Sequence, residues 1–240
     1  MKYTLTNLHV QPLESWLERL RHNCEVKVFS PQEIVPERLE QILELGCSAP
    51  SPWNIQPWQF IVVRTPAARA KLLRYCPQPG PAATAPVLVV GLADPAAWKD
   101  APARLSEMVT TGALDAAQEA AHLRRVLQQW GRREAAQMFA IAQTYLALHH
   151  MAMLALAWDI DSTWLLEFDA HTIQEAFHIP SRLLVVAVLA LGYPQERATA
   201  PSVSSAEKIF AEAYGLPWGR SETPSSPPPK TANKSEHNST

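Results

Sequence analysis

The sequence predicts an α+β fold in which a central mixed or antiparallel sheet is packed between helices. Two unbroken apolar runs, residues 87–91 and 183–191, have the length of buried strands, and residues 58–64 form a third predicted strand. Long helical segments separate these strands, so strands and helices do not alternate regularly. Only eight glycines occur in 240 residues, and neither apolar run is followed by G-x-G-x-x-G. A doubly wound dinucleotide-binding fold is therefore disfavoured.

The helices are predicted from apolar residues that recur every three or four positions. In the clearest case a helix begins at Pro36, with Leu39, Ile42 and Leu43 on one face and charged residues on the other. Asp169 is a candidate N-cap for a late helix. We expect helices at residues 12–21, 36–46, 66–74, 116–130, 134–158 and 171–177.

Composition limits the domain organisation and the partners. With 47% hydrophobic residues the chain can bury a sizeable core, so we expect one large domain over residues 1–217. The polar, proline-rich stretch 218–240 cannot bury enough apolar surface to offset its ordering entropy, and we predict that it is disordered. The formal net charge of -2 provides no basic excess, which argues against nucleic acid and anionic lipid as partners.

Cysteine usage and the N-terminal segment predict a cytoplasmic protein. Cys24, Cys47 and Cys76 form no C-x-x-C pair and are odd in number, which argues against a zinc ribbon or a disulfide framework. The opening stretch MKYTLTNLHVQPLESW has no apolar signal core. Residues 135–158 are uncharged and long enough to span a bilayer, but five polar residues interrupt them. We predict a buried central helix there and no membrane partner.

The segment APSPWNIQPW, residues 49–58, carries the most specific signal in the chain. It joins a predicted helix to a predicted strand, and its three prolines stiffen a loop at low entropic cost. Ser51, Asn54 and Gln56 place hydroxyl and amide groups on this loop. A flat polar heterocycle is a plausible ligand, because its heteroatoms need fixed polar partners and its faces need apolar cover. The alternative is a structural loop whose polar groups satisfy its own backbone.

The segment APSPWNIQPWQFIVV resembles the A-P-S-x-x-N-x-Q-P-W-x-F signature of nitroreductase-type flavoproteins. PERLEQILELGCSAPS resembles the helix that leads into this signature, and MFAIAQTYLALHHMAMLALAWDIDS resembles the long central helix of the family. FDAHTIQEAFHIP and LLVVAVLALGYP resemble its late helix and final core strand. The resemblance extends over residues 16–195, which is most of the chain.

This resemblance implies a nitroreductase-like fold and an obligate homodimer with FMN at the subunit interface. It implies that NADH or NADPH reduces the flavin, which then reduces a small electrophilic acceptor such as a nitroaromatic or a quinone. Pro50, Ser51 and Asn54 match positions that hold the isoalloxazine and ribityl parts of the cofactor, and Gln56 matches a position that supports the loop. Lys27 matches a basic residue that contacts the FMN phosphate.

Three departures from the family pattern affect the predicted cofactor site. In the R-x-S-x-[RK]-x-F stretch, Asn23 replaces the arginine and Glu25 replaces the serine, so a cation is lost and an anion is gained. Val203 and Ser204 stand where the family often has a basic residue. Glu167 takes the place of a glycine whose backbone N–H faces the flavin N5; its own N–H can still donate there.

These departures keep two further hypotheses open. One is a flavoprotein with a different reaction, which would bind FMN but turn over poorly with nicotinamide donors. The other is a degenerate, non-catalytic member of the fold that binds another ligand or a partner protein.

The sequence contains two E-x-x-H pairs, a pattern also found in metal sites. The E-x-x-H pairs Glu119/His122 and Glu175/His178 would need further inward glutamates on separate helices to hold metal, so we predict no metal site.

Residues 98–131 lie where the family often places its substrate-side helices. One amphipathic surface is expected there, formed by Met108, Leu114, Leu123, Val126, Leu127 and Trp130.

Overall fold

The structure is a computed structural model that describes residues 13–21, 26–197 and 208–216. The chain divides into two compact units, Met1–Ala200 and Pro201–Thr240. In the second unit residues 208–216 form turns, and the rings of Phe210 and Tyr214 lie 4.7 Å apart. The predicted disordered tail and the predicted boundary at residue 217 lie outside the described residues, as do Cys24, Asn23, Glu25, Val203 and Ser204.

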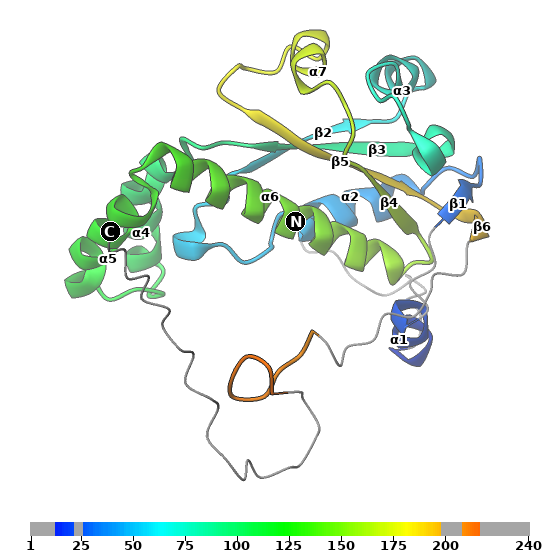
Figure 1. The fold of residues 1–240 in the computed structure, drawn as a ribbon. Helices are drawn as coiled ribbons and strands as arrows, with labels where there is room; N and C mark the ends of the chain where they lie inside the picture. The colour runs from blue at the N-terminus through cyan, green and yellow to red at the C-terminus, as the bar shows by residue number, and fades with distance from the viewer. Residues whose placement is uncertain (1–12, 22–25, 198–207, 217–240) are drawn as a thin grey trace, which may run out of the picture. The chain divides into compact units, whose positions relative to one another are not determined.

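The first unit is built on a four-stranded antiparallel sheet (Figure 1), as the fold-class prediction stated. Its strand order is β2 (Trp58–Val63), β3 (Val87–Ala93), β5 (Leu184–Gly192), β4 (Asp161–Leu165). A separate two-stranded sheet pairs β1 (Val26–Phe29) with β6 (Pro194–Arg197). The three predicted strands are β2, β3 and β5. Strands β1, β4 and β6 were not predicted, because they are short and lack a long apolar run.

Seven helices are described in this unit, and six of them match the predicted segments. The predicted helix at 116–130 begins with a 3-10 turn over Ala116–Gln118, and one further helix in the 98–131 region, α4, was not predicted. Asp169 is an N-cap, as predicted: its carboxylate accepts a hydrogen bond from the N–H of Thr172 at 3.1 Å. The bounds are α1 Leu13–Arg21, α2 Pro36–Gly46, α3 Pro66–Leu73, α4 Ala101–Thr110, α5 Glu119–Trp130, α6 Arg133–Leu156 and α7 Ala170–Ala176.

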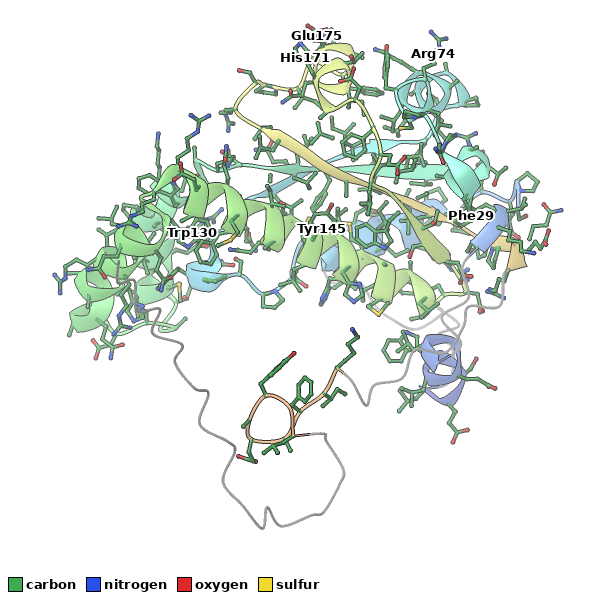
Figure 2. All side chains as sticks on the ribbon, viewed as in Figure 1. Phe29, Arg74, Trp130, Tyr145, His171 and Glu175 are labelled. Carbon is green, nitrogen blue, oxygen red and sulfur yellow. The ribbon has the colours of Figure 1, made fainter. Side chains whose placement is uncertain are left out.

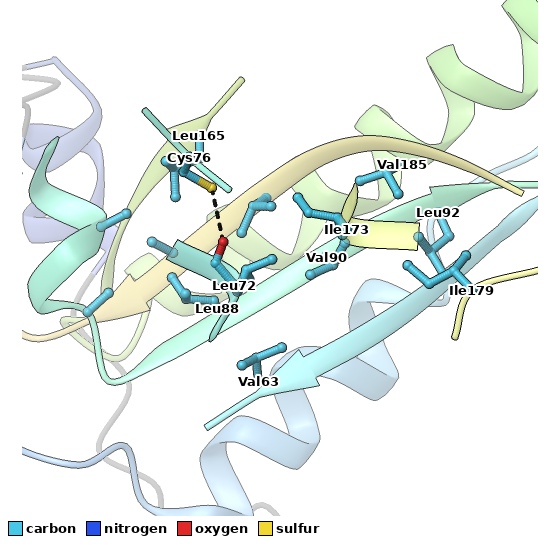
Figure 3. Packing of buried hydrophobic residues seen from close by; sticks show 14 of the residues in the cluster. Val63, Leu72, Cys76, Leu88, Val90, Leu92, Leu165, Ile173, Ile179 and Val185 are labelled. Atoms are coloured by element: carbon cyan, nitrogen blue, oxygen red, sulfur yellow. Dashed lines mark hydrogen bonds between the residues drawn. The ribbon is translucent and has the colours of Figure 1, made fainter. Parts of the chain in front are cut away.

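Helices cover both faces of the sheet. In Figure 1, α3 and α7 lie on one face, and α2 and α6 lie on the other. Alternate residues of β3 accordingly enter two different cores: Leu88 and Val90 pack on the α3/α7 side (Figure 3), whereas Val87 and Val89 pack on the α2/α6 side. Because the central strands are buried on both faces, they appear in the sequence as unbroken apolar runs.

Helix α6 is the central helix of the fold. Among the described residues, α6 is the one helix that is long and apolar enough to cross a membrane. It packs, however, against α2 and all four strands of the sheet. Gly91 permits the close approach, since a Cβ there would meet Leu148 Cδ1 at 2.6 Å. Tyr145 donates a hydrogen bond at 2.8 Å to the carbonyl of Val186, a residue skipped by the β3–β5 register. The prediction of a buried central helix is confirmed.

Candidate functional site

The signature loop, residues 47–57, runs from the end of α2 to the start of β2. Three of its non-glycine residues have left-handed backbone conformations: Trp53 and Asn54 at φ 53° and Gln56 at φ 48°. Asparagine tolerates this region, but a bulky tryptophan there is unusual. Such a concentration persists only where the surrounding structure fixes the backbone.

Hydrogen bonds within the loop fix that backbone. The Ser51 hydroxyl oxygen accepts from the N–H of Gln56 at 3.0 Å, and the N–H of Asn54 donates to the Ser51 carbonyl at 3.0 Å. The Gln56 side-chain amide donates to the carbonyl of Cys47 at 3.4 Å. Ser51 and Gln56 therefore use polar groups to build the loop itself.

The loop also presents polar groups outward. Ile55 and Trp58 are buried and anchor it, whereas Pro50 and Asn54 are exposed. None of the hydrogen bonds found between the described residues engages the Asn54 side-chain amide. The purely structural interpretation thus accounts for Ser51 and Gln56 but leaves the donor and acceptor of Asn54 available to a ligand.

Lys27 and Glu167 lie away from the signature loop, Lys27 on the β1–β6 sheet and Glu167 after the edge strand β4. Lys27, on β1, forms an ion pair with Glu196 of β6 at 2.9 Å, and both side chains are more than half exposed (53% and 57%). Arg197 of β6 donates to the carboxylate of Asp161 on β4 at 2.7 Å, which links the β1–β6 sheet to the four-stranded sheet. Glu167 follows the end of β4 and is exposed.

The structure does not bring the predicted site residues together within one chain. The signature loop leads into β2 and Glu167 follows β4, and these strands are the two edges of the sheet. Three inter-strand spacings put about 14 Å between the edges. Lys27 is linked to the Asp161 end of β4, because its neighbour Val26 pairs with Arg197, which bonds Asp161, whereas Glu167 follows the Leu165 end.

A helical cluster packs beside the signature loop. Ile55 and Trp53 contact the buried residues Val126 and Trp130, and the Trp130 ring stacks on Phe139 at 5.2 Å. Figure 2 shows Trp130 near the α5 end of the sheet and Phe29 near the β1 end.

The predicted amphipathic surface of this region is largely confirmed. Val126 and Trp130 are buried, and Met108, Leu114 and Leu123 are half-buried. The prediction was wrong for Leu127, whose side chain is 47% exposed because it points away from the cluster that its neighbour Val126 enters.

One polar contact crosses from this cluster to the loop. The indole N–H of Trp53 donates to Nδ1 of His122 on α5 at 2.9 Å. Sequence reasoning considered His122 only as half of an E-x-x-H pair. Within the described ranges, no three histidine, cysteine or acidic residues are grouped so that they could hold a metal ion.

The two described cysteines are not activated thiols. Cys47, at the start of the loop, is largely exposed. Its pKa is nevertheless raised above that of an ordinary cysteine, first because neighbouring atoms partly desolvate the thiol and second because the Glu44 carboxylate is close. Burial likewise raises the pKa of Cys76, whose thiol donates to the Leu72 carbonyl at 3.6 Å (Figure 3). A raised pKa lowers the thiolate population on which nucleophilic chemistry depends.

With this geometry established, comparison with known proteins identifies the family. The sequence model of the nitroreductase family matches residues 21–193, which is well over half of the chain. The chain belongs to the nitroreductase family. The α+β architecture predicted from the sequence is the fold of its nitroreductase structural neighbours, and the family assigns the chain to the oxidoreductases.

Three relatives illustrate the similarity. A protein of Thermus thermophilus named NADH dehydrogenase is 35% identical over 165 residues, covering 68% of this chain and 78% of its own. A nitroreductase-like protein of Streptococcus mutans superposes with a TM-score of 0.72 at 22% identity, covering 84% of this chain and 99% of its own. A protein of Exiguobacterium sibiricum solved in complex with FMN gives a TM-score of 0.71 at 20% identity, covering 81% and 95%.

Proposed function

We propose that this nitroreductase-family protein is an FMN-dependent oxidoreductase that passes electrons from NADH or NADPH to a small electrophilic acceptor, such as a nitroaromatic or a quinone. The observation that carries the proposal is the signature loop, which fixes its own backbone while it presents the Asn54 amide outward. The FMN-bound neighbour of the same fold supports the choice of cofactor.

The separation of the site residues supports a homodimer. One chain presents the signature loop at the β2 edge, Glu167 after the β4 edge strand, and Lys27 on the β1–β6 sheet, whose Arg197 bonds Asp161 of β4. We infer that two copies bring the loop of one subunit against the β4 edge of the other, which gives two equivalent sites. A closed twofold arrangement of this kind is the commonest form of soluble oligomer. The apolar side chains of Met138 and Leu146, exposed on α6, are consistent with a covering subunit.

The residues present fit a flavin in chemistry and extent. The separation of Lys27 and Glu167 along β4 suits an elongated ligand with a charged group at one end. Gln143 provides a further signal, because both polar atoms of its amide are buried without a partner in the described part of the chain. It lies on α6 one turn before Ala147, which packs with Ala49 and Trp58 beside the loop. A buried amide without a partner is costly, so a cofactor or a second subunit is expected to satisfy it.

Each site residue then has a distinct role. We assign the Asn54 amide, together with the O–H donor that Ser51 retains while its oxygen accepts from Gln56, to hydrogen bonds with the polar edge of the flavin ring and the ribityl chain, and Pro50 to apolar cover of the ring. Gln56 holds the loop. Lys27 would bind the phosphate as a point charge, and the backbone N–H of Glu167 would serve as a hydrogen-bond donor to the flavin ring. When bound, FMN supplies the hydride and electron transfer chemistry, while these residues orient it and tune its potential.

The visible absorption spectrum of the purified protein tests this proposal. It is recorded as purified, again after incubation with FMN and removal of the unbound FMN by gel filtration, and then after NADH or NADPH is added under nitrogen. We expect flavin bands that bleach with the nicotinamide. Bands that persist would indicate a flavoprotein with another reductant or reaction. Absence of flavin bands after FMN is supplied would eliminate the enzyme proposal.

The second candidate is a non-catalytic member of the fold, and one observation favours it: Lys27 is already paired with Glu196. Under this alternative, the protein is a colourless, folded dimer whose melting temperature does not rise with added FMN. We place either form in the cytoplasm, because Cys47 and Cys76 are both free.

A further inference from the structure

We propose that Trp53 and His122 form a positioning pair through which helix α5 holds the signature loop in its ligand-binding conformation. The pair lies outside the set of residues assigned above to flavin contacts. Its consequence for FMN affinity rests on the proposed function, but its effect on the loop does not.

The contact joins segments that are distant in sequence. Trp53 Nε1 lies 2.9 Å from His122 Nδ1, and 69 positions separate the two residues. The Trp53 ring is half-buried and packs with the cluster of Ile55, Val126 and Trp130. The apolar face of the indole therefore packs against the helices, and the N–H on its edge donates a directional hydrogen bond to α5.

The backbone of Trp53 needs external support. At φ 53° the residue occupies the left-handed region, which a bulky side chain rarely adopts. Asn54 follows directly in the same conformation, so the torsion angles of Trp53 set the orientation of the Asn54 backbone and amide. Because the Trp53 side chain is anchored on α5, the backbone torsion angles of Trp53 are constrained from outside the loop as well as from within it. A strained backbone conformation persists only where the surrounding structure fixes it in this way.

The chemistry of the acceptor is selective. An imidazole Nδ1 accepts a hydrogen bond only when it carries no proton, which requires the neutral ring with its proton on Nε2. The indole N–H can only donate. An asparagine at position 122 can present a carbonyl oxygen near the place of Nδ1, whereas phenylalanine retains the ring shape without an acceptor.

Four variants isolate the pair: Trp53→Phe, His122→Phe, the double variant, and His122→Asn as the conservative rescue. In the FMN-loaded protein we expect Trp53→Phe and His122→Phe each to weaken FMN binding about fivefold, as loss of one hydrogen bond predicts. The double variant should be no weaker than either single variant, because both remove the same contact. His122→Asn should restore most of the affinity.

Nitrogen-15 NMR of the tryptophan indoles provides a readout independent of FMN. The resonance absent in Trp53→Phe identifies Trp53. In His122→Phe it should move and exchange faster with solvent, and the backbone amides of residues 53–56 should also exchange faster. His122→Asn should resemble the parent protein.

The outcomes separate this proposal from the proposed function. A parent protein that binds no FMN would defeat the proposed function, and amide exchange in the loop would then decide the positioning pair by itself. Unchanged exchange of residues 53–56 in both phenylalanine variants would overturn the pair. Additive losses of FMN affinity in the double variant would also overturn it.

Discussion

The two halves of the candidate site are stabilised in different ways. At the β2 edge the signature loop is fixed by short-range hydrogen bonds from Ser51 and Gln56 and by the buried anchors Ile55 and Trp58. At the β4 edge the charged residues pair with one another, Lys27 with Glu196 and Arg197 with Asp161. The first half is defined by backbone geometry and packing, and the second by charges that largely cancel.

This difference predicts that the halves respond to different perturbations. Exposed ion pairs contribute little to the free energy of folding or binding, and salt weakens them further. The packing of a loop, in contrast, does not depend on ionic strength. Changes at the loop should therefore affect any flavin equally. Changes at the ion pair of Lys27 and Glu196 should affect FMN but not riboflavin, which has the same ring system and ribityl chain without the phosphate.

The largest effect is expected from Gly46→Ala, at the end of α2 where the loop begins. A Cβ at this position would clash with Met151 Cγ of α6. Overpacking of this kind costs about 1–3 kcal/mol, which corresponds to a melting temperature lower by roughly 2–12 °C. Differential scanning calorimetry measures the shift.

Met151→Ala provides the control for this clash. If the clash is its cause, Gly46→Ala combined with Met151→Ala should destabilise less than the sum of the two single variants. Strict additivity would show that the two residues do not compete for the same space.

Asn54 tests the loop half directly. Asn54→Ala removes the outward amide and places a residue that disfavours the left-handed region at φ 53°. We expect both FMN and riboflavin to bind about tenfold more weakly, measured by quenching of flavin fluorescence. Asn54→Gly keeps the backbone conformation without the amide and should fall between the parent and Asn54→Ala. Affinity equal to the parent in both variants would exclude Asn54 from the site.

Lys27 and Glu196 test the charged half. Lys27→Met should weaken FMN about fivefold, while Glu196→Gln should release Lys27 and tighten FMN about threefold at low salt. Both effects should fade at high salt, and riboflavin affinity should stay unchanged. A parallel change in riboflavin affinity would mean that this corner does not contact the phosphate.

The smallest effect concerns Cys47, whose backbone carbonyl accepts from Gln56. Because its pKa is raised, less thiolate is present at any pH below that pKa, so alkylation by iodoacetamide at pH 8 should be slower than for an ordinary cysteine. Glu44→Gln removes the smaller of the two causes, and it should speed alkylation while leaving the larger effect of burial. Mass spectrometry of the peptide containing Cys47 measures the rate, and equal rates in both proteins would contradict the effect of Glu44.

Local sequence patterns predicted the elements whose burial is continuous. Strands β3 and β5 are apolar on both faces, and helix α2 shows a clear apolar stripe. Strand β4 has the sequence DSTWL, which shows neither an apolar run nor clean alternation, because Asp161 is buried through its bond to Arg197. That bond depends on β6, which lies more than 30 residues later in the chain.

The sequence by itself determined the α+β class, the buried central helix and the loop segment within residues 49–58, because apolar periodicity and prolines act over short stretches. Only the tertiary structure decided that Lys27 and Glu167 lie across the sheet from the signature loop, and that His122 accepts from Trp53. Strand order and contacts between distant segments depend on how the elements pack, and no local pattern encodes that packing.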